Sequence, residues 1–376
     1  MISVNHTLKN PILDLFHHFH SHPETSWHEV ETTAYITNLL KENGCRVRTF
    51  ADCTGVVGDI GAGEPVVAIR ADMDALWQEV DGDFQGNHSC GHDAHMAVVL
   101  GTLLTIKQSD QPLNGTVRFI FQPAEEKGTG ALKMVDEQVV DDVDYLYGVH
   151  LRPIQEIPHG TASPSLYHGA ARFISGKIKG EDAHGARPHL NTNAIDIGAA
   201  LVNRVNSIHQ DPMIPHSAKL TSFHAGGESA NIIPGSAQFS IDLRAQSNEV
   251  MEGLTAQLEK SVRTLEEDYG VTIELQRQAD VAAAVVHPEA QSLMEKTIIS
   301  VLGSEQYRAP LVTTGGDDFH FYTIKRPELK ATMLGLGCDL EPGLHHPHMS
   351  FNHEAILNGV DILTDVILRT LNKERD

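Results

Sequence analysis

Short β-rich runs alternate with helical stretches in the first part of this chain of 376 residues. The run 66–71 has the composition of a buried strand, and 116–121 and 145–150 resemble further strands. Two segments with helical spacing of apolar residues, 94–104 and 130–135, lie between them. Strands separated by helices in this order favour βαβ units. We therefore expect an α/β fold built on a mixed, mainly parallel sheet with helices on both faces.

A second pattern interrupts the first. Between about residues 172 and 281, strands and helices follow one another in the order β-α-β-β-α-β, which is the order of the ferredoxin-like α+β unit. The expected strands are 172–179, 218–224, 237–243 and 271–276, and the expected helices are 194–208 and 248–267. The chain is also too long for one ordinary core. We therefore expect a first domain of residues 1–171 and 282–376, interrupted by a second domain of residues 172–281.

The charge balance narrows the class of partner. Lys and Arg number 28 against 50 Asp and Glu, which gives a net charge of −22. Such a field repels nucleic acid and anionic membranes, so neither is an expected partner. No run approaches the roughly 18 apolar residues of a membrane span, and the first residues lack a basic leader and an apolar core. With four scattered Cys, which suit reduced thiols, this predicts a cytoplasmic protein.

Histidine is frequent, at 23 residues, and several histidines stand close together. In the segment 89–96 (SCGHDAHM), the Cys90 thiol and the His92 imidazole are two residues apart and could converge on one metal ion at the start of a helix. Zn(II) accepts both ligand types. A Cys-x-His pair also arises by chance, and a single histidine is more often a surface or core residue. The segment therefore suggests a metal site, which would need further ligands from elsewhere in the chain.

Further candidate ligands follow other strands. Glu125 and Glu126 come directly after the strand 116–121, and the carboxyl ends of parallel strands are where α/β proteins place their sites. One carboxylate could bind metal while the other takes a proton from water, although a polar loop is the alternative. His150 ends another strand, and His345 lies in a loop before the last helix. Either histidine could add an imidazole ligand.

Two aspartates follow the strand 66–71. If the extended conformation continues, alternation puts Asp72 and Asp74 on the same side of the chain. They could bind metal or hold a metal-binding histidine in the right tautomer, and Asp74 could instead be a helix cap or turn former. Because candidate ligands occupy several separate loops and strand ends that one sheet could gather, the combination predicts a metal centre.

Motifs along nearly the whole chain resemble those of one family. They are HxHPE (20–24), RADMDAL (70–76), SCGHDAHM (89–96), FQPAEE (121–126), GVHL (148–151) and the HHP loop (345–347). The family is that of the co-catalytic metallo-aminoacylases and carboxypeptidases, in the subfamily of hippurate hydrolase, auxin-conjugate hydrolases and N-acetyldiaminopimelate deacetylase. The resemblance implies a two-metal amidohydrolase with a catalytic α/β domain and a smaller lid or dimerisation domain.

The resemblance also implies roles for single residues. The family's metal ligands fall on Cys90, His92, Glu126, His150 and His345. The general base falls on Glu125, the acidic residue of the family's Arg-Ala-Asp segment on Asp72, and a supporting carboxylate on Asp74. In the lid, the segment 182–188 is similar to the family's Gly-His-Ala stretch, so that His184 would reach the substrate carbonyl. Asn231, in a segment similar to Asn-Val-Ile-Pro, would lie near the substrate carboxylate.

Some positions depart from the family pattern. Trp77 stands where the family usually has Pro, Asp317 lies in a changed Gly-Ser-Glu-Asp-Phe segment, and Met349 alters the residues after the HHP loop. The loop 78–88 is also shorter than usual. These changes leave the implied ligands in place, but they alter the wall of the substrate pocket. The substrate of a relative therefore cannot be assumed for this chain.

The expected reaction is hydrolysis of the amide bond of an N-acyl, for example N-acetyl, amino acid or a related small conjugate. Two divalent ions, of which Zn, Mn, Co and Ni are not distinguished, would activate a water to hydroxide, with Glu125 as the base and His184 stabilising the oxyanion. A dipeptidase or carboxypeptidase on the same centre is the alternative. A metal-storage or sensing protein would not require Glu125, and no glycine-rich phosphate loop supports nucleotide binding. The strand 172–179 could pair edge to edge with a second copy and form a homodimer.

Overall fold

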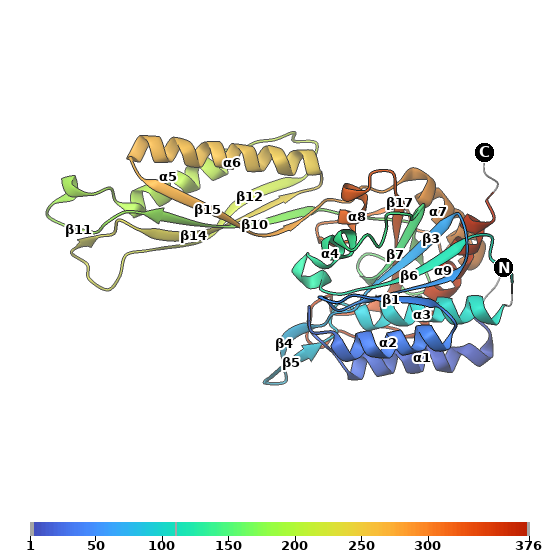
Figure 1. Cartoon of the computed structure of the whole chain (residues 1–376). Helices are drawn as coiled ribbons and strands as arrows, with labels where there is room; N and C mark the ends of the chain where they lie inside the picture. The colour runs from blue at the N-terminus through green and yellow to red at the C-terminus, as the bar shows by residue number, and fades with distance from the viewer. Residues whose placement is uncertain (1–3, 110, 374–376) are drawn as a thin grey trace. The chain divides into compact units, whose positions relative to one another are not determined.

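The computed structural model describes residues 4–109 and 111–373 and divides them into two compact units (Figure 1). The first unit contains the described residues up to Tyr167, Val285–Val312 and those from Asp318 onward. The second unit contains His168–Ala284 and the short segment Thr313–Asp317. The division into a catalytic domain and a lid or dimerisation domain, with boundaries after residues 171 and 281, stays a prediction.

A seven-stranded mixed sheet forms the centre of the first unit, in the order β1-β2-β6-β3-β7-β17-β8. Its strands are β1 (Arg46–Thr49), β2 (Val56–Gly61), β3 (Val66–Asp72), β6 (Thr116–Gln122), β7 (Tyr145–Pro153), β8 (Ala162–Ser163) and β17 (Lys330–Leu340). The four central strands, β6, β3, β7 and β17, are parallel to one another, and the outer strands are antiparallel. The expected α/β fold with a mainly parallel sheet is confirmed.

Helices cover both faces of this sheet because its central strands are buried on both sides. In β3, Val67 and Ile69 join one hydrophobic core while Val66 and Ala68 join another. The first core is completed by α1 (His6–Ser21), α2 (Val30–Glu42), α3 (His92–Gln108), α7 (Pro288–Leu302) and α9 (Glu354–Leu371), and the second by α4 (Gly130–Asp136) and α8 (His320–Lys325). Alternation along one strand thus anchors both layers of helices.

A β-hairpin stands where the sequence suggested only a short loop. It joins β4 (Leu76–Val80) to β5 (Asp83–Asn87) through Asp81 and Gly82, which both have positive φ angles, 54° and 94°. An Asp-Gly pair at such a turn is a strong hairpin signal. The hairpin leads the chain from the end of β3 to the start of α3. Two short strands, β9 (Leu166–His168) and β16 (Leu311–Thr313), form a separate pair.

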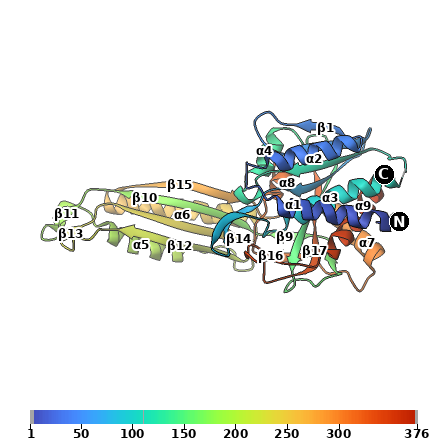
Figure 2. The same ribbon diagram turned by 90° about the horizontal axis from the view of Figure 1, so that it is seen from below.

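The second unit is a four-stranded antiparallel sheet packed against two helices (Figure 2). Its main elements are β10 (Ala170–Lys179), α5 (Ala194–Asn206), β12 (His216–Ala225), β14 (Ala237–Ala245), α6 (Asn248–Tyr269) and β15 (Thr272–Val281). The strand order β12-β14-β10-β15 is that of a ferredoxin-like unit. Short segments complete it: β11 (Ala183–His184), the 3₁₀ helix η2 (Pro188–Leu190) and β13 (Ile232–Ile233).

The expectation that the strand 172–179 offers an edge to a second copy is wrong. These residues lie in β10, which is hydrogen-bonded on both sides, to β14 and to β15. The sequence shows alternation along a strand but does not show which neighbours it has, so an interior strand can be mistaken for an edge. The edges of this sheet are β12 and β15. None of the helices among the described residues is long and apolar enough to span a membrane.

Candidate metal centre

The candidate ligands of the first unit gather at one edge of its sheet. Three parallel strands end there: β3 at Asp72, β6 at Gln122, and β7 at Pro153, three residues after His150. The start of α3 adds His92, preceded by Gly91 with a φ of 86°. A Cβ atom at Gly91 would lie 2.9 Å from Leu151 Cδ1, so both the backbone angle and the close approach to β7 favour glycine.

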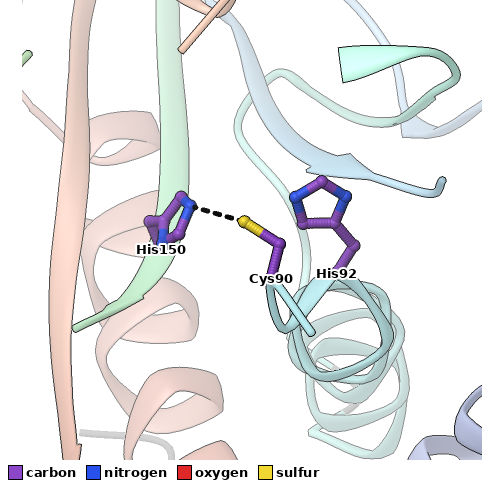
Figure 3. Close-up of side chains that lie close together, drawn as sticks. All are labelled: Cys90, His92 and His150. Atoms are coloured by element: carbon purple, nitrogen blue, oxygen red, sulfur yellow. Dashed lines mark hydrogen bonds between the residues drawn. The ribbon is translucent and has the colours of Figure 1, made fainter. Parts of the chain in front are cut away.

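Cys90, His92 and His150 form a compact group of buried side chains (Figure 3). One potential ligand atom from each lies within 4.8 Å of the other two, and Cys90 Sγ is 3.8 Å from His150 Nε2. Bond lengths of about 2.0 Å to nitrogen and 2.3 Å to sulfur place two ligands of one tetrahedral zinc roughly 3.5 Å apart. The observed spacing is therefore close to that of two ligands on one ion.

Backbone carbonyls fix the orientation of both imidazoles. His150 Nδ1 donates to the carbonyl oxygen of Leu151 at 2.7 Å, and His92 Nδ1 donates to that of Asp74 at 2.8 Å. Since a carbonyl can only accept, each Nδ1 carries a proton, and Nε2 is the ring atom that remains for a metal ion. His92 Nε2 is buried and has no hydrogen-bond partner among the described residues. A histidine that binds metal through Nε2 commonly has its Nδ1 proton on such an acceptor.

Glu126 and His345 form a second group that shares Cys90 with the first. His345 Nε2 lies 3.3 Å from Glu126 Oε1, and that carboxylate oxygen is buried with no hydrogen-bond partner in residues 4–109 and 111–373. The loop of His345 is held in place because its N–H donates to Ser89 O at 2.7 Å and its carbonyl accepts from Gln78 Nε2 at 2.8 Å. Two overlapping groups suit two neighbouring cations.

The donor set fits divalent metal. Thiolate, imidazole and carboxylate together suit zinc and its neighbours among the transition metals. Burial, followed by the nearby Glu126 carboxylate, raises the pKa of the Cys90 thiol well above its ordinary value. A cation at this position would reverse that effect and favour the thiolate. Among the described residues, His92 Nε2 and Glu126 Oε1 are buried without a hydrogen-bond partner, and such an ion would satisfy both atoms.

Glu125 lies beside these groups. It begins the 3₁₀ helix η1 (Glu125–Lys127), and its Oε2 is 3.9 Å from His92 Nε2. The backbone N–H groups of Glu125 and Glu126 both donate to the carboxylate of Asp74, at 3.2 Å and 3.0 Å. Asp74 also accepts from the Ser26 hydroxyl at 2.6 Å. Asp74 thus supports the turn that carries both glutamates as well as the His92 ring.

Asp72 is fully buried beside the candidate ligand His92. Its carboxylate accepts from Arg70 at 2.6 Å and pairs with His95 Nδ1 at 2.7 Å, and it lies 3.8 Å from His92 Nε2. Burial would raise the pKa of Asp72, but the charges of His92 and Arg70 hold it well below the ordinary value. Arg70 in turn donates to Asp318 at 2.9 Å. Asp72 therefore stays ionised in a buried network.

His184 and Asn231 belong to the second unit, where the structure brings their segments together. His184 lies in β11 opposite Ile232 of β13, and the N–H of Gly185 donates to Asn231 O at 2.7 Å. Both residues are exposed. His184 Nδ1 accepts from the N–H of Ala186 at 3.0 Å. Their predicted contacts with substrate stay predictions.

Several residues of this region were missed in the sequence. Asp318 and Gln122 both bond the buried Arg70, and Gln122 also donates to Asp318 at 2.8 Å. His95 bonds Asp72 and accepts from the N–H of Leu151. Arg70 and His95 stand inside conspicuous motifs and could have been found as partners of Asp72. Asp318 also lies in a segment that resembles the family pattern, but 248 positions separate it from Arg70, so the sequence does not show that the two are partners.

Comparison with known proteins identifies the family of this chain. Residues 68–369 match the family described as Peptidase family M20/M25/M40. The chain is 31% identical to N-acetyl-L-cysteine deacetylase of Bacillus subtilis, over 98% of this chain and 90% of that protein. It is 30% identical to thermostable carboxypeptidase 1 of Saccharolobus solfataricus, with 84% of each chain covered.

A solved structure shows the same fold. The Bacillus subtilis YXEP protein, described as a dinuclear metal-binding peptidase of the M20 family, superposes with a TM-score of 0.84 and 25% identity. The match covers 99% of this chain and 100% of that one. The suspected family is confirmed. The chain belongs to the M20/M25/M40 peptidase family and is a metal-dependent hydrolase of amide bonds.

Proposed function

We propose that this enzyme hydrolyses the amide bond of N-acyl amino acids, with N-acetyl amino acids as the first substrates to test. The observation that carries the proposal is the position of Glu125, whose Oε2 lies 3.9 Å from His92 Nε2 at the edge of the ligand cluster. A site that only stored metal would not need a second carboxylate there. The similarity to a deacetylase of an N-acetyl amino acid supports this substrate class.

The roles proposed for the residues follow from their chemistry. Cys90, His92, Glu126, His150 and His345 would hold two divalent ions, for which Zn, Mn, Co and Ni are all candidates. When bound, such ions polarise the substrate carbonyl and lower the pKa of water toward neutrality. Glu125 takes a proton from the attacking water and returns it to the leaving nitrogen. Asp72 bonds His95, and Asp74 keeps the His92 ring and the Glu125 turn in place.

The second unit is proposed to complete the site and the assembly. His184 would donate to the developing oxyanion, and Asn231 would bind the carboxylate of the amino acid. The edge strands β12 and β15 are the surfaces through which two copies could pair. We also propose the cytoplasm as the compartment, since all four cysteines are unpaired.

The role of Glu125 is tested by Glu125→Gln. We expect the variant to retain its zinc and to lose about 10²- to 10⁴-fold in kcat on an N-acetyl amino acid, because the amide cannot accept the proton. Glu79→Gln, on an exposed hairpin position, is the matched control and should behave as wild type. Near-normal turnover by a zinc-loaded Glu125→Gln protein would contradict the proposed role of Glu125 as the general base.

The similarity to a carboxypeptidase supports a second candidate activity. A dipeptidase or carboxypeptidase would use the same centre. Its substrates would be dipeptides with a free amino group, or longer peptides, in place of N-acyl amino acids. A panel of N-acetyl amino acids, dipeptides and N-blocked peptides separates the two, since kcat/KM reports differential binding of the transition state. Preference for the acetylated compounds supports the first proposal, and preference for peptides supports the second.

A further inference from the structure

Three successive backbone N–H groups in the turn after β6 donate to buried carboxylates. Those of Glu125 and Glu126 donate to Asp74, and that of Ala124 donates to Glu29 Oε1 at 2.9 Å. Glu29 precedes α2 and is fully buried, with an exposed fraction of 0%. Nothing in the proposed chemistry uses this carboxylate. It nonetheless bonds the residue directly before the proposed base and the proposed ligand.

Ala124 needs such support because its backbone is left-handed, with φ 53° and ψ 41°. A residue with a Cβ atom adopts this conformation at a cost and keeps it where the surroundings enforce it. The direction in which the chain leaves Ala124 decides where the side chains of Glu125 and Glu126 point. A relaxed backbone at residue 124 would therefore move both carboxylates away from the histidines.

Glu29 is itself held rigidly. Its Oε2 accepts from the Thr54 hydroxyl at 2.6 Å, while Oε1 accepts from Ala124. The next residue, Gly55, packs so closely on the turn that a Cβ atom there would lie 2.7 Å from Pro123 Cδ. The start of α2 and the segment 54–55 thus form one support beneath the turn. Its polar contact with the turn is the Glu29 carboxylate.

We propose that Glu29 is a positioning residue of the metal centre. Its carboxylate holds Ala124 in the left-handed conformation, and this aims Glu126 at the metal and Glu125 at the substrate water. The part that concerns Glu125 rests on the proposed function. The part that concerns Glu126 depends only on metal binding, so the two can be tested apart.

The test measures the affinity of the full-length protein for Zn²⁺ by competition with a chelator. Glu29→Leu removes the acceptor, and we expect it to weaken zinc binding about 10- to 100-fold, as loss of supporting residues around metal ligands does. Glu29→Gln keeps an oxygen for the Ala124 N–H and should stay within about threefold of wild type. Glu31→Leu, at an exposed position of the same helix, is the matched control and should change nothing.

A second substitution distinguishes positioning from a general loss of structure. Glycine adopts the left-handed conformation freely, so Ala124→Gly should remove the strain that Glu29 counteracts. In the double variant with Glu29→Leu, we expect about fivefold or more of the lost zinc affinity to return. A residue that merely stabilised the fold would give no such recovery. If Glu29→Leu does not fold, Thr54→Val replaces it, with an expected loss of about fivefold.

The outcomes separate this inference from the proposed function. Zinc affinity unchanged by Glu29→Leu, or by Thr54→Val in its place, overturns the inference. So does a double variant that binds zinc no more tightly than Glu29→Leu alone. If the zinc results are as expected but the wild-type enzyme cleaves no N-acyl amino acid, the positioning role stands and the proposed function fails.

Discussion

Several charged side chains are buried in the first unit, and each forms hydrogen bonds or ion pairs with more than one partner. Arg70 is fully buried, yet it bonds Gln122 as well as the carboxylates of Asp72 and Asp318. An unpaired charge in such a place would be prohibitive, whereas a charge with complete hydrogen bonding is tolerated. The same principle applies to Glu29 and Asp74, which accept backbone N–H groups. These hydrogen bonds hold the side chains next to the candidate metal centre in place.

The ion pairs of Glu289 predict that the stability of the fold depends on pH. It pairs with Lys330 at 2.6 Å and with Lys373, and it accepts from the Tyr145 hydroxyl at 2.6 Å. The hydrogen bonds from Lys330 and Lys373 lower the pKa of Glu289 to about 2. Because the folded pKa is depressed, its contribution to stability is present above about pH 4.5 and is lost as the pH falls toward 2.

Glu289→Gln should therefore lower the free energy of unfolding at pH 7 by about 1 kcal/mol, a value already reduced for solvent screening. The difference from wild type should shrink as the pH falls below 4.5. Urea unfolding at several pH values measures both quantities. Glu305→Gln, at an exposed position, is the control. A difference that stays constant from pH 7 to pH 3 would contradict the assigned ion pairs.

At the scale of a strand, the residue type at one position depends on the side chain that packs over it from the neighbouring strand. In the second unit, Gly176 of β10 stands opposite Phe239 of β14, and the aromatic ring covers the glycine. A Cβ atom at Gly176 would lie 2.1 Å from Phe239 Cζ. Phe239 is 2% exposed and belongs to the core beneath α5 and α6. The glycine thus makes room for the aromatic ring in the middle of the sheet.

Gly176→Val should destabilise the protein by about 1–3 kcal/mol, the usual cost of overpacking a core. Gly227→Ala is the matched control, since nothing lies within 4 Å of a Cβ atom at that position. Thermal unfolding followed by circular dichroism compares the two variants. A melting temperature unchanged by Gly176→Val would contradict the packing of Phe239 over Gly176.

At the scale of the whole molecule, the sequence predicts architecture better than supporting contacts. The alternation of strands and helices predicts the α/β sheet because buried strands have a distinct composition, as in β3. The motif residues Cys90, His92 and His150 stand beside strand ends or a helix start, which one edge of a sheet brings together. Glu29 and Asp318 bond partners that are far away in the sequence, so the sequence alone does not show which residues they support.

Strand neighbours are a further property that the local sequence does not carry. The residues of β10 alternate like those of an edge strand, but two partners cover it. The hairpin of β4 and β5 was predictable in principle, since its Asp81-Gly82 turn is a known signal. What remained hidden is that Gln78 of this hairpin accepts from Ser89 Oγ and bonds the loop of His345.

The number of zinc ions retained by the intact protein tests the metal centre most directly. Native mass spectrometry of the zinc-loaded wild-type chain should show two ions, because two overlapping ligand groups share Cys90. The Cys90→Ala/His150→Ala double variant should lose at least one of them while remaining folded. A wild-type protein that retains no zinc, or a double variant that still holds two ions, would contradict the account.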